Sequence, residues 1–323
     1  MLFLNKTEIA AIEPELIQNA VYKSYELVLS NAYTMPDRVH VEEGENTLLL
    51  MPCFSGSYFA TKLVSVFPGA PKMNLPAVNG IMTLADNQTG KPLAIMDGAA
   101  VTAQRTGAVG GLGAALLTRT DLNTAGVFGA GVQGYSQARY LLENRNIKTL
   151  YIGDLYQESA QKMADILAKE FADIDFKVAS TPVDLVRESE LIIAATTSKA
   201  PLFENDPDLV KGKTFISIGS FRPDMKEFPD AVITGADHIY VDTPFAAKES
   251  GDICVPLERK LVGQEDIIPF AQLVQAPIPL DDGNGNSKTL FFKSVGMALF
   301  DLAVASAIYE LAVEEKFGVN LEF

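Results

Sequence analysis

The chain has 323 residues, of which 26 are Lys or Arg and 41 are Asp or Glu, so its formal net charge is −15. At about 150 residues per domain this length predicts two domains, and 48% hydrophobic with 21% charged residues is the composition of a globular protein. The acidic balance excludes a general binder of nucleic acid or of anionic membranes, because either needs a basic surface.

The N-terminal third predicts a helix, then strands, then a second helix. Residues 13–30 carry apolar side chains at helical spacing, and Pro14 suits the first turn of that helix. Closely spaced strand-like runs with turn signals between them follow at 38–42, 47–53, 58–67, 78–85 and 92–96. Short turns between strands indicate a largely antiparallel sheet. A helix rich in Gly and Ala is then predicted at 99–118.

From residue 123 onward the pattern alternates between strand and helix. Helices are predicted at 135–144 and 157–171, and strands at 124–128, 148–153, 176–179, 191–195, 214–218 and 239–241. Such alternation predicts a doubly wound parallel sheet of the Rossmann type, and hence an α/β protein. A last helix, predicted at 293–316, is apolar all round, and we expect it to return and pack on the first domain.

The cysteines and the apolar segments of the chain indicate its cellular location. Cys53 and Cys254 are the only cysteines and lie far apart in the sequence, which excludes a disulfide framework and favours a reducing cytoplasm. The first residues are too few for a signal-peptide core, and no segment is typical of a membrane span. We expect a soluble cytoplasmic protein.

The sharpest motif is Gly129-Ala130-Gly131-Val132-Gln133-Gly134, which follows a predicted strand and opens a predicted helix. In a dinucleotide-binding turn the three glycines permit a tight turn, close approach to a pyrophosphate and close helix–strand packing, while the helix N-terminus offers amides to the phosphates. Asp154 ends the next strand, where a carboxylate can accept from ribose hydroxyls. An acid there repels a 2′-phosphate, so the pattern favours NAD, with NADP left open.

Other chemistries find less support in the sequence. Gly212-Lys213-Thr214 resembles the end of a phosphate-binding P-loop, but Pro207 stands where the loop needs its first glycine. The two histidines, His40 and His238, have no paired spacing, so no metal site is predicted. No Gly-x-Ser-x-Gly elbow indicates a hydrolase.

Taken together, the chain resembles the ornithine cyclodeaminase/mu-crystallin family over nearly its whole length. The resemblance rests on five strings in this order: Arg105-Thr106-Gly107-Ala108, Gly129-Ala130-Gly131-Val132-Gln133, Ala195-Thr196-Thr197-Ser198, Gly251-Asp252-Ile253 and Lys293-Ser294-Val295-Gly296. It implies a homodimer with an α+β substrate-binding and dimerisation domain formed by residues 1–119 and 297–323. Residues 120–296 would form the dinucleotide-binding domain.

The resemblance also implies site residues. The family binds the carboxylate of an amino or imino acid with basic groups, and the matching positions are Arg38, Lys62 and Arg105, with Lys62 expected to be catalytic. A guanidinium can hold a carboxylate bidentately and a lysine adds a further charge. The residues expected to bind the cofactor are Arg105, Thr106, Gly129, Ala130, Gly131, Val132, Gln133, Asp154, Thr196, Thr197 and Ser198. The segment 196–198 would lie along the nicotinamide half of the cofactor.

One position departs from the family pattern. Cyclodeaminases carry a proton-handling aspartate after the strand that corresponds to 214–218, and Phe221 stands there in this chain. Asp224 is three residues further on, beyond a proline, so it could replace that acid only through a shifted loop. The variant string resembles the branch of the family that contains Δ1-pyrroline-2-carboxylate and related ketimine reductases.

We therefore predict an NAD(P)-dependent oxidoreductase that reduces a small cyclic imino acid, with Δ1-pyrroline-2-carboxylate and L-proline as the leading pair. Reduction of a preformed imine needs fewer proton transfers than cyclodeamination does. Ornithine cyclodeaminase and alanine dehydrogenase activities remain alternatives, as does a non-catalytic binding protein of the mu-crystallin kind.

Overall fold

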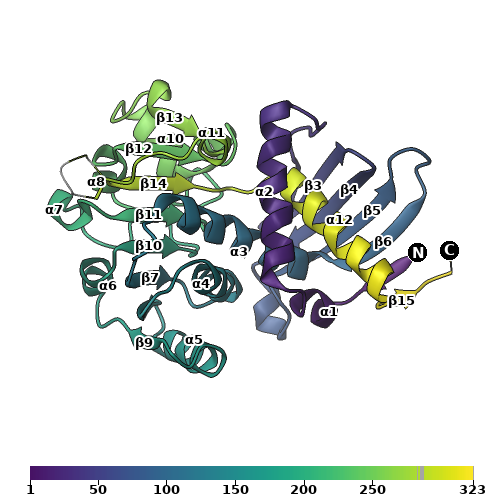
Figure 1. Ribbon diagram of the computed structural model, residues 1–323, viewed down its shortest axis with the longest axis horizontal. Helices are drawn as coiled ribbons and strands as arrows, with labels where there is room; N and C mark the ends of the chain where they lie inside the picture. Colours follow the sequence, from purple (N-terminus) through teal and green to yellow (C-terminus); the bar gives the residue numbers. More distant parts are fainter. Residues whose placement is uncertain (282, 284–286, 323) are drawn as a thin grey trace. The chain divides into compact units, whose positions relative to one another are not determined.

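The computed structural model describes residues 1–281, 283 and 287–322 of the chain, which folds as two compact units (Figure 1). Unit 1 comprises Met1–Arg105 and Met297–Phe323, and unit 2 comprises Thr106–Gly296. The first division falls inside helix α3 (Gly98–Leu117), whereas the sequence suggests a boundary at the end of that helix, between residues 119 and 120. The second division, between residues 296 and 297, lies where the sequence also suggests one.

Unit 1 is built on a seven-stranded sheet in the order β15-β1-β6-β5-β4-β3-β2. Strands β2 to β6 pair antiparallel, as the short turns predict, while β1 pairs parallel with β6. The strands are β1 (Leu2–Leu4), β2 (Val39–Glu43), β3 (Asn46–Ser55), β4 (Tyr58–Val66), β5 (Val78–Asp86), β6 (Pro92–Asp97) and β15 (Val319–Asn320). The helices wholly inside this unit are α1 (Lys6–Ala10), α2 (Pro14–Ser30) and α12 (Ala298–Glu315), with a 3₁₀ turn at Ala70–Met73.

Helix α12 packs on strands β3, β4 and β5 of this sheet, and α2 lies beside α12 (Figure 1). Ser24 of α2 is fully buried, and its hydroxyl donates to the carbonyl of Ala20, so a small polar residue fits within the apolar stripe. Tyr25 meets Phe300 of α12 edge to face, with 5.1 Å between the ring centroids. The last helix therefore packs on the first domain, as the sequence predicts.

Unit 2 contains an eight-stranded, wholly parallel sheet in the order β13-β12-β14-β11-β10-β7-β8-β9. Its strands are β7 (Thr124–Phe128), β8 (Thr149–Gly153), β9 (Asp175–Val178), β10 (Leu191–Ala194), β11 (Thr214–Ser217), β12 (His238–Val241), β13 (Ile267–Pro269) and β14 (Leu290–Lys293). Its helices after α3 are α4 (Val132–Asn144), α5 (Gln157–Glu170), α6 (Pro182–Glu188), α7 (Pro207–Val210), α8 (Asp230–Thr234), α9 (Ala246–Glu249), α10 (Gly251–Glu258) and α11 (Phe270–Gln275), with a 3₁₀ turn at Gln264–Asp266.

The order of strands in this sheet reverses at β7. From there the chain proceeds outward through β8 and β9, then returns to the other side of β7 with β10 and β11. Open sheets of this kind bind ligands at the carboxyl ends of the strands beside such a reversal. The fold therefore places the segments that follow β7 and β10 next to each other.

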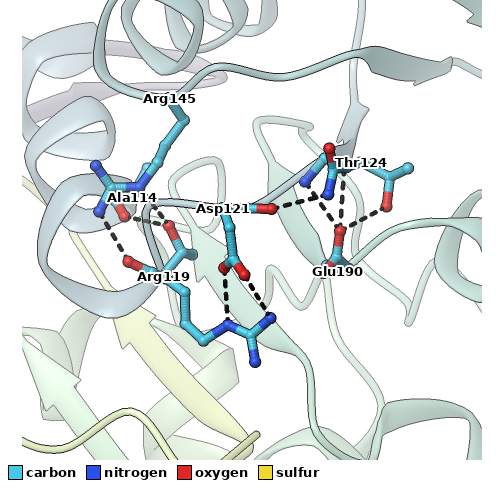
Figure 2. A network of polar contacts seen from close by, with 8 residues as sticks. Ala114, Arg119, Asp121, Thr124, Arg145 and Glu190 are labelled. Carbon is cyan, nitrogen blue, oxygen red and sulfur yellow. Dashed lines mark hydrogen bonds and ion pairs between the residues drawn. The ribbon is translucent and has the colours of Figure 1, made fainter.

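The opposite, amino end of the sheet is held by a polar network (Figure 2). Glu190 accepts with Oε2 from the backbone N–H groups of Asn123 and Thr124, both at 3.1 Å, and from the Thr124 hydroxyl at 3.2 Å. Arg145 donates to Thr118 at the end of α3, with 2.9 Å from Nε to the hydroxyl oxygen. The Glu190 contacts hold the start of β7 at the amino end of the sheet, the end opposite the glycine motif.

The structure corrects the start of the last predicted helix. Residues 290–293 form strand β14, inserted between β11 and β12, and helix α12 begins only at Ala298. Gly296 adopts a left-handed conformation (φ +76°) that ends the strand segment and turns the chain into the helix. The prediction was wrong here because a wholly buried apolar strand and a buried helix have the same hydropathy.

Several short elements were not predicted: strands β1, β13 and β15, helix α1, and helices α6 to α11. Among the described residues, no helix is both long enough and apolar enough to span a membrane.

Candidate active site

The predicted site residues fall into two groups, one in each unit. Arg38, Lys62 and Arg105 belong to unit 1, and all the other predicted residues belong to unit 2. Arg105 and Thr106 are neighbours on α3, at the residue where the two units meet in the sequence.

Lys62 occupies a core position of the unit 1 sheet. It lies in the middle of β4, in register with Met51 of β3 and Met82 of β5, and only 2% of it is exposed. Alternation along β4 turns Ala60, Lys62 and Val64 toward the helices, so the ammonium group takes the place of an apolar core side chain. A buried charge requires a partner, and the structure supplies one.

That partner is Asp301, a fully buried residue of α12 that the sequence-based site prediction missed. Lys62 Nζ lies 2.9 Å from Asp301 Oδ1 and 2.8 Å from Oδ2, and Arg105 Nε donates to Oδ1 at 3.1 Å. Lys62 also donates to the Thr102 hydroxyl on α3, at 3.2 Å. A signal did exist: Asp301 is the one acidic residue within the first three turns of an otherwise apolar helix.

The charges in this cluster do not balance. Among the described residues, Asp301 is the one acid that forms an ion pair with Lys62 and Arg105, so these two cations exceed it by one charge. The charge of the half-buried Arg38 also acts on Lys62. Burial, opposed by the attraction of Asp301, lowers the pKa of Lys62 from 10.5 to about 8. The surplus of positive charge suits an anionic ligand, and Lys62 can gain or lose a proton near neutral pH.

Cys53 lies on the same buried face of β3 and is no nucleophile. Burial, and then the charge of Asp301, raise the pKa of its thiol to about 12. The thiol therefore stays protonated and acts as a small apolar side chain.

In unit 2 the glycine motif forms the turn that the sequence predicts. Gly129 has φ +97°, and a Cβ there would lie 2.6 Å from the carbonyl oxygen of Ala195, which follows β10. A Cβ on Gly134 would overlap the backbone of Gly129, whereas one on Gly131 would meet nothing within 4 Å. The turn is thus closely packed on its inner side and open at Gly131.

The first turn of α4 has no side-chain cap, since Gly131 is its N-cap residue. Its leading amides are therefore available to an anion. Two predicted cofactor residues also hold buried polar atoms without a hydrogen-bond partner among the described residues: Thr106 Oγ1 and Gln133 Oε1. Thr106 lies beside α4, where Gln137 Nε2 donates to its carbonyl oxygen at 2.7 Å. Open space, free amides and unpaired polar atoms together fit a dinucleotide at this turn.

Asp154 stands at the carboxyl end of β8 and orders the turn. Its Oδ2 accepts from the N–H of Ala130 at 2.7 Å, and its Oδ1 accepts from the N–H of Tyr156 at 2.9 Å. Each carboxylate oxygen retains a lone pair, so the predicted contact with ribose hydroxyls is compatible with this geometry.

The segment 196–198 follows β10 directly. Thr196 Oγ1 accepts from the N–H of Ser198 at 3.2 Å, the Ser198 hydroxyl donates to Ala200 at 2.6 Å, and Thr197 is exposed. This segment lies next to the glycine turn, because Ala195 is the residue that packs against Gly129.

Asp224 does not take the place of the missing family acid. It is a surface residue that pairs with Lys199 at 2.8 Å and with Arg222 at 3.2 Å. The hydrogen bond from Lys199 lowers the pKa of its carboxyl. An ionised, ion-paired carboxylate is a poor proton donor, and Phe221 has no proton to give.

Comparison with known proteins identifies the family. The family model described as "Ornithine cyclodeaminase/mu-crystallin family" matches residues 7–316. The chain belongs to the ornithine cyclodeaminase/mu-crystallin family. A Δ1-pyrroline-2-carboxylate reductase of Bacillus cereus is 33% identical over 283 residues, which cover 86% of each chain.

Two solved structures extend the comparison. The Thermococcus litoralis Δ1-pyrroline-2-carboxylate reductase in complex with NADH and L-proline has a TM-score of 0.91 at 29% identity, covering 99% of this chain and 100% of that one. An archaeal alanine dehydrogenase dimer with bound NAD has a TM-score of 0.89 at 28% identity, covering 100% and 99%. The family and the α/β, Rossmann-type fold class predicted from the sequence are confirmed.

Proposed function

We propose that this chain reduces a small cyclic imino acid with NAD(P)H, and that Δ1-pyrroline-2-carboxylate, which yields L-proline, is its substrate. It is an oxidoreductase of carbon–nitrogen bonds, and NAD(H) is its cofactor, with NADP(H) open as a second choice. The names of the relatives agree with the activity predicted from the sequence.

The observation that carries the proposal is the cationic cluster of unit 1. A carboxylate held by Arg38, Lys62 and Arg105 neutralises charge that Asp301 leaves unbalanced. Arg105 Nε is engaged with Asp301, so a carboxylate would be held by the two terminal guanidinium nitrogens. The cluster thus binds the carboxylate and fixes the adjoining imine carbon relative to it.

Lys62 has a second task, because reduction of an imine adds a hydride to carbon and a proton to nitrogen. With a pKa of about 8 its ammonium holds a proton at neutral pH that costs little to release. The negative charge of Asp301 raises the pKa of Lys62 and so favours the ammonium form that carries this proton. The missing family acid is therefore not required for this reaction.

The residues of unit 2 that would hold the cofactor are those of the glycine turn, with Thr106, Asp154 and the segment 196–198. The amides of α4 would take the pyrophosphate and Asp154 the adenosine ribose. The nicotinamide ring supplies the hydride when the cofactor is bound. Unit 1 (residues 1–105 and 297–323) would then be the substrate-binding domain and unit 2 the dinucleotide-binding domain.

The uncovered face of the unit 1 sheet supports a homodimer. Val39, Leu50, Leu63 and Ile81 stand in register across β2, β3, β4 and β5, and they point away from the helices. Val39 is 48% exposed and Ile81 46%. A second copy would bury this apolar row, and the solved alanine dehydrogenase relative is a dimer.

We place the protein in the cytoplasm, where both buried cysteines would remain free thiols, as they are in the structure.

The test is steady-state oxidation of NADH and NADPH with three substrates: Δ1-pyrroline-2-carboxylate, Δ1-piperideine-2-carboxylate, and pyruvate with ammonia. We expect turnover with a cyclic imine. Turnover with pyruvate and ammonia alone would identify an alanine dehydrogenase, and NAD⁺-dependent ammonia release from ornithine would identify a cyclodeaminase. Retention of a ligand without nicotinamide oxidation would identify a binding protein. Any one of these last three results would refute the proposal.

A further inference from the structure

Unit 2 contains a second buried group of charged residues, which the proposed chemistry does not use. Glu227 and Lys293 are fully buried and Asp252 is 3% exposed, and all three meet at the fully buried Ser217, the last residue of β11. Asp252 and Lys293 come from two of the strings that carry the family resemblance, Gly251-Asp252-Ile253 and Lys293-Ser294-Val295-Gly296. Neither string has a role in binding substrate or cofactor as described above.

Glu227 joins the segments that follow two neighbouring strands. Its Oε1 accepts from the N–H of Thr196 at 2.6 Å and from the Thr196 hydroxyl at 2.9 Å, just after β10. Its Oε2 accepts from the N–H groups of Gly219 at 2.8 Å and Ser220 at 3.1 Å, just after β11. One carboxylate therefore satisfies backbone donors from both segments.

The two segments are in backbone contact at this point. A Cβ on Gly219 would overlap the backbone of Thr196 and would lie 2.6 Å from Glu227 Oε1. The position of Thr196, at the predicted nicotinamide side of the cofactor site, is thus set by Gly219 and Glu227 together.

Asp252 and Gly251 hold Glu227 from the other side. Asp252 Oδ1 accepts from the N–H of Glu227 at 2.9 Å and from that of Phe228 at 3.0 Å. A Cβ on Gly251 would overlap the carbonyl oxygen of Met225, so the start of α10 packs directly on the segment before Glu227. These contacts fix the backbone from which the Glu227 side chain extends.

Ser217 and Lys293 complete the group. Lys293 Nζ donates to the Ser217 hydroxyl oxygen at 2.8 Å, and that oxygen lies 2.9 Å from Glu227 Oε2 and 2.8 Å from Asp252 Oδ2. Ser217 has a single hydroxyl hydrogen, so one of its two carboxyl contacts needs a hydrogen from the carboxyl side. With that shared proton, the two acids and Lys293 sum to zero charge, which makes their burial tolerable.

We propose that Glu227 is a positioning residue for the cofactor: it fixes Thr196 and the segment 196–198 against the end of β11, and Asp252 and Lys293 hold it in place. The inference rests on the proposed cofactor site in unit 2. Every partner of the two Glu227 oxygens that comes from residues 196, 219 and 220 is a donor. An amide at position 227 can therefore serve only one of the two segments.

The experiment compares Glu227→Gln with Glu190→Gln. Glu190 offers a matched control because it also accepts from backbone N–H groups and a threonine hydroxyl, but at the amino end of the sheet. In the protein without NADH, amide hydrogen exchange followed by mass spectrometry should rise in Glu227→Gln within peptides that cover 194–199 and 217–221. The dissociation constant for NADH, measured by the fluorescence of the bound dinucleotide, should increase about tenfold or more.

The expected kinetic pattern is also specific. In Glu227→Gln the KM for NADH should rise while the KM for the imino acid stays within about twofold, because the carboxylate-binding residues belong to unit 1. Glu190→Gln should change neither the exchange of these peptides nor the affinity for NADH. If Glu227→Gln does not fold, Glu227→Asp gives the same comparison, because it keeps the charge and shortens the side chain by one methylene.

Two failures can be told apart. A wild-type protein that neither binds NADH nor reduces the imine refutes the proposed function. A wild-type protein that does both, alongside a Glu227 variant with unchanged exchange and unchanged NADH affinity, refutes the positioning role alone. An equal loss of NADH affinity in both Gln variants also refutes it, since the effect would then be general destabilisation.

Discussion

Replacing Asp301 with asparagine tests whether this carboxylate sets the charge of Lys62. The change preserves size and removes the negative charge that faces Lys62 Nζ at 2.8 Å and Arg105 Nε at 3.1 Å. Lys62 can respond by losing its proton, which at pH 7 costs about 1 kcal/mol because its pKa is about 8. Arg105 stays charged and loses a charge-assisted hydrogen bond, which costs about 1.5–3 kcal/mol. We expect Asp301→Asn to lower the free energy of unfolding by about 3–4 kcal/mol at pH 7.

The same reasoning gives the sign of the pH dependence. At pH 9 most of the wild-type Lys62 is already neutral, so losing Asp301 costs only the contribution of Arg105. The destabilisation should therefore shrink by about 1 kcal/mol between pH 7 and pH 9. Wild-type kcat/KM for the imine should fall as the pH rises through about 8, and in Asp301→Asn the fall should begin at lower pH, because Asp301 raises the pKa of Lys62.

Urea unfolding at the two pH values and a pH profile of kcat/KM measure these quantities. Glu310→Gln is the matched control, since Glu310 lies on the same helix but is exposed, and its carboxylate accepts from the Tyr58 hydroxyl at 3.1 Å. It should change stability by less than about 0.5 kcal/mol at either pH. A destabilisation by Asp301→Asn that is the same at pH 7 and pH 9, with an unshifted kcat/KM profile, would show that Asp301 does not control the charge of Lys62.

Four further predictions concern single positions. Lys62→Met should retain NADH affinity and lose about 100-fold or more in kcat/KM for the imine, whereas unchanged kinetics would remove Lys62 from the site. Asp154→Ser should shift selectivity toward NADPH by about tenfold in kcat/KM, because the repulsion of a 2′-phosphate is removed. Thr106→Val should weaken NADH binding about tenfold at unchanged Tm, since its hydroxyl has no partner among the described residues; equal NADH affinity would contradict a cofactor contact. Ile81→Asp should convert a dimer to a monomer in light scattering, and a dimer that survives would move the interface off this face.

The sequence predicts most of the fold because the relevant signals are local. Strand β7 and helix α2 are found almost to the residue, since period and turn chemistry within a few residues determine them. Strand β14 is the informative failure, because its four residues are wholly buried and carry no alternation. Only its pairing with β11 and β12, which are distant in sequence, distinguishes it from the first turn of a helix.

The residues of the candidate site also divide into those found from local sequence signals and those that only long-range contacts reveal. The glycine turn and Asp154 can be found from sequence because a strand, a turn and a helix within about 30 residues build them. Asp301 lies 239 residues from Lys62, and no spacing rule connects them. Glu227 is equally hidden, since three of its backbone donors come from residues 196, 219 and 220 and its neighbour Asp252 lies 25 residues further along the chain.

These buried charges also show how an acidic protein can bind an anion. The chain carries 15 more acidic than basic residues, so a cationic cleft that lay open to solvent would attract the protein's own carboxylates and be neutralised by them. Unit 1 avoids this by placing Lys62 on the buried face of the sheet. Among the described residues, Asp301 is the one acid that forms an ion pair with it there. A single acid stabilises two cations well enough to keep them buried and still leaves positive charge for a substrate carboxylate. A second acid beside Lys62 would abolish that surplus. We therefore expect Met82→Glu, which adds a carboxylate in register with Lys62, to raise the KM for the imine steeply while leaving the dissociation constant for NADH unchanged.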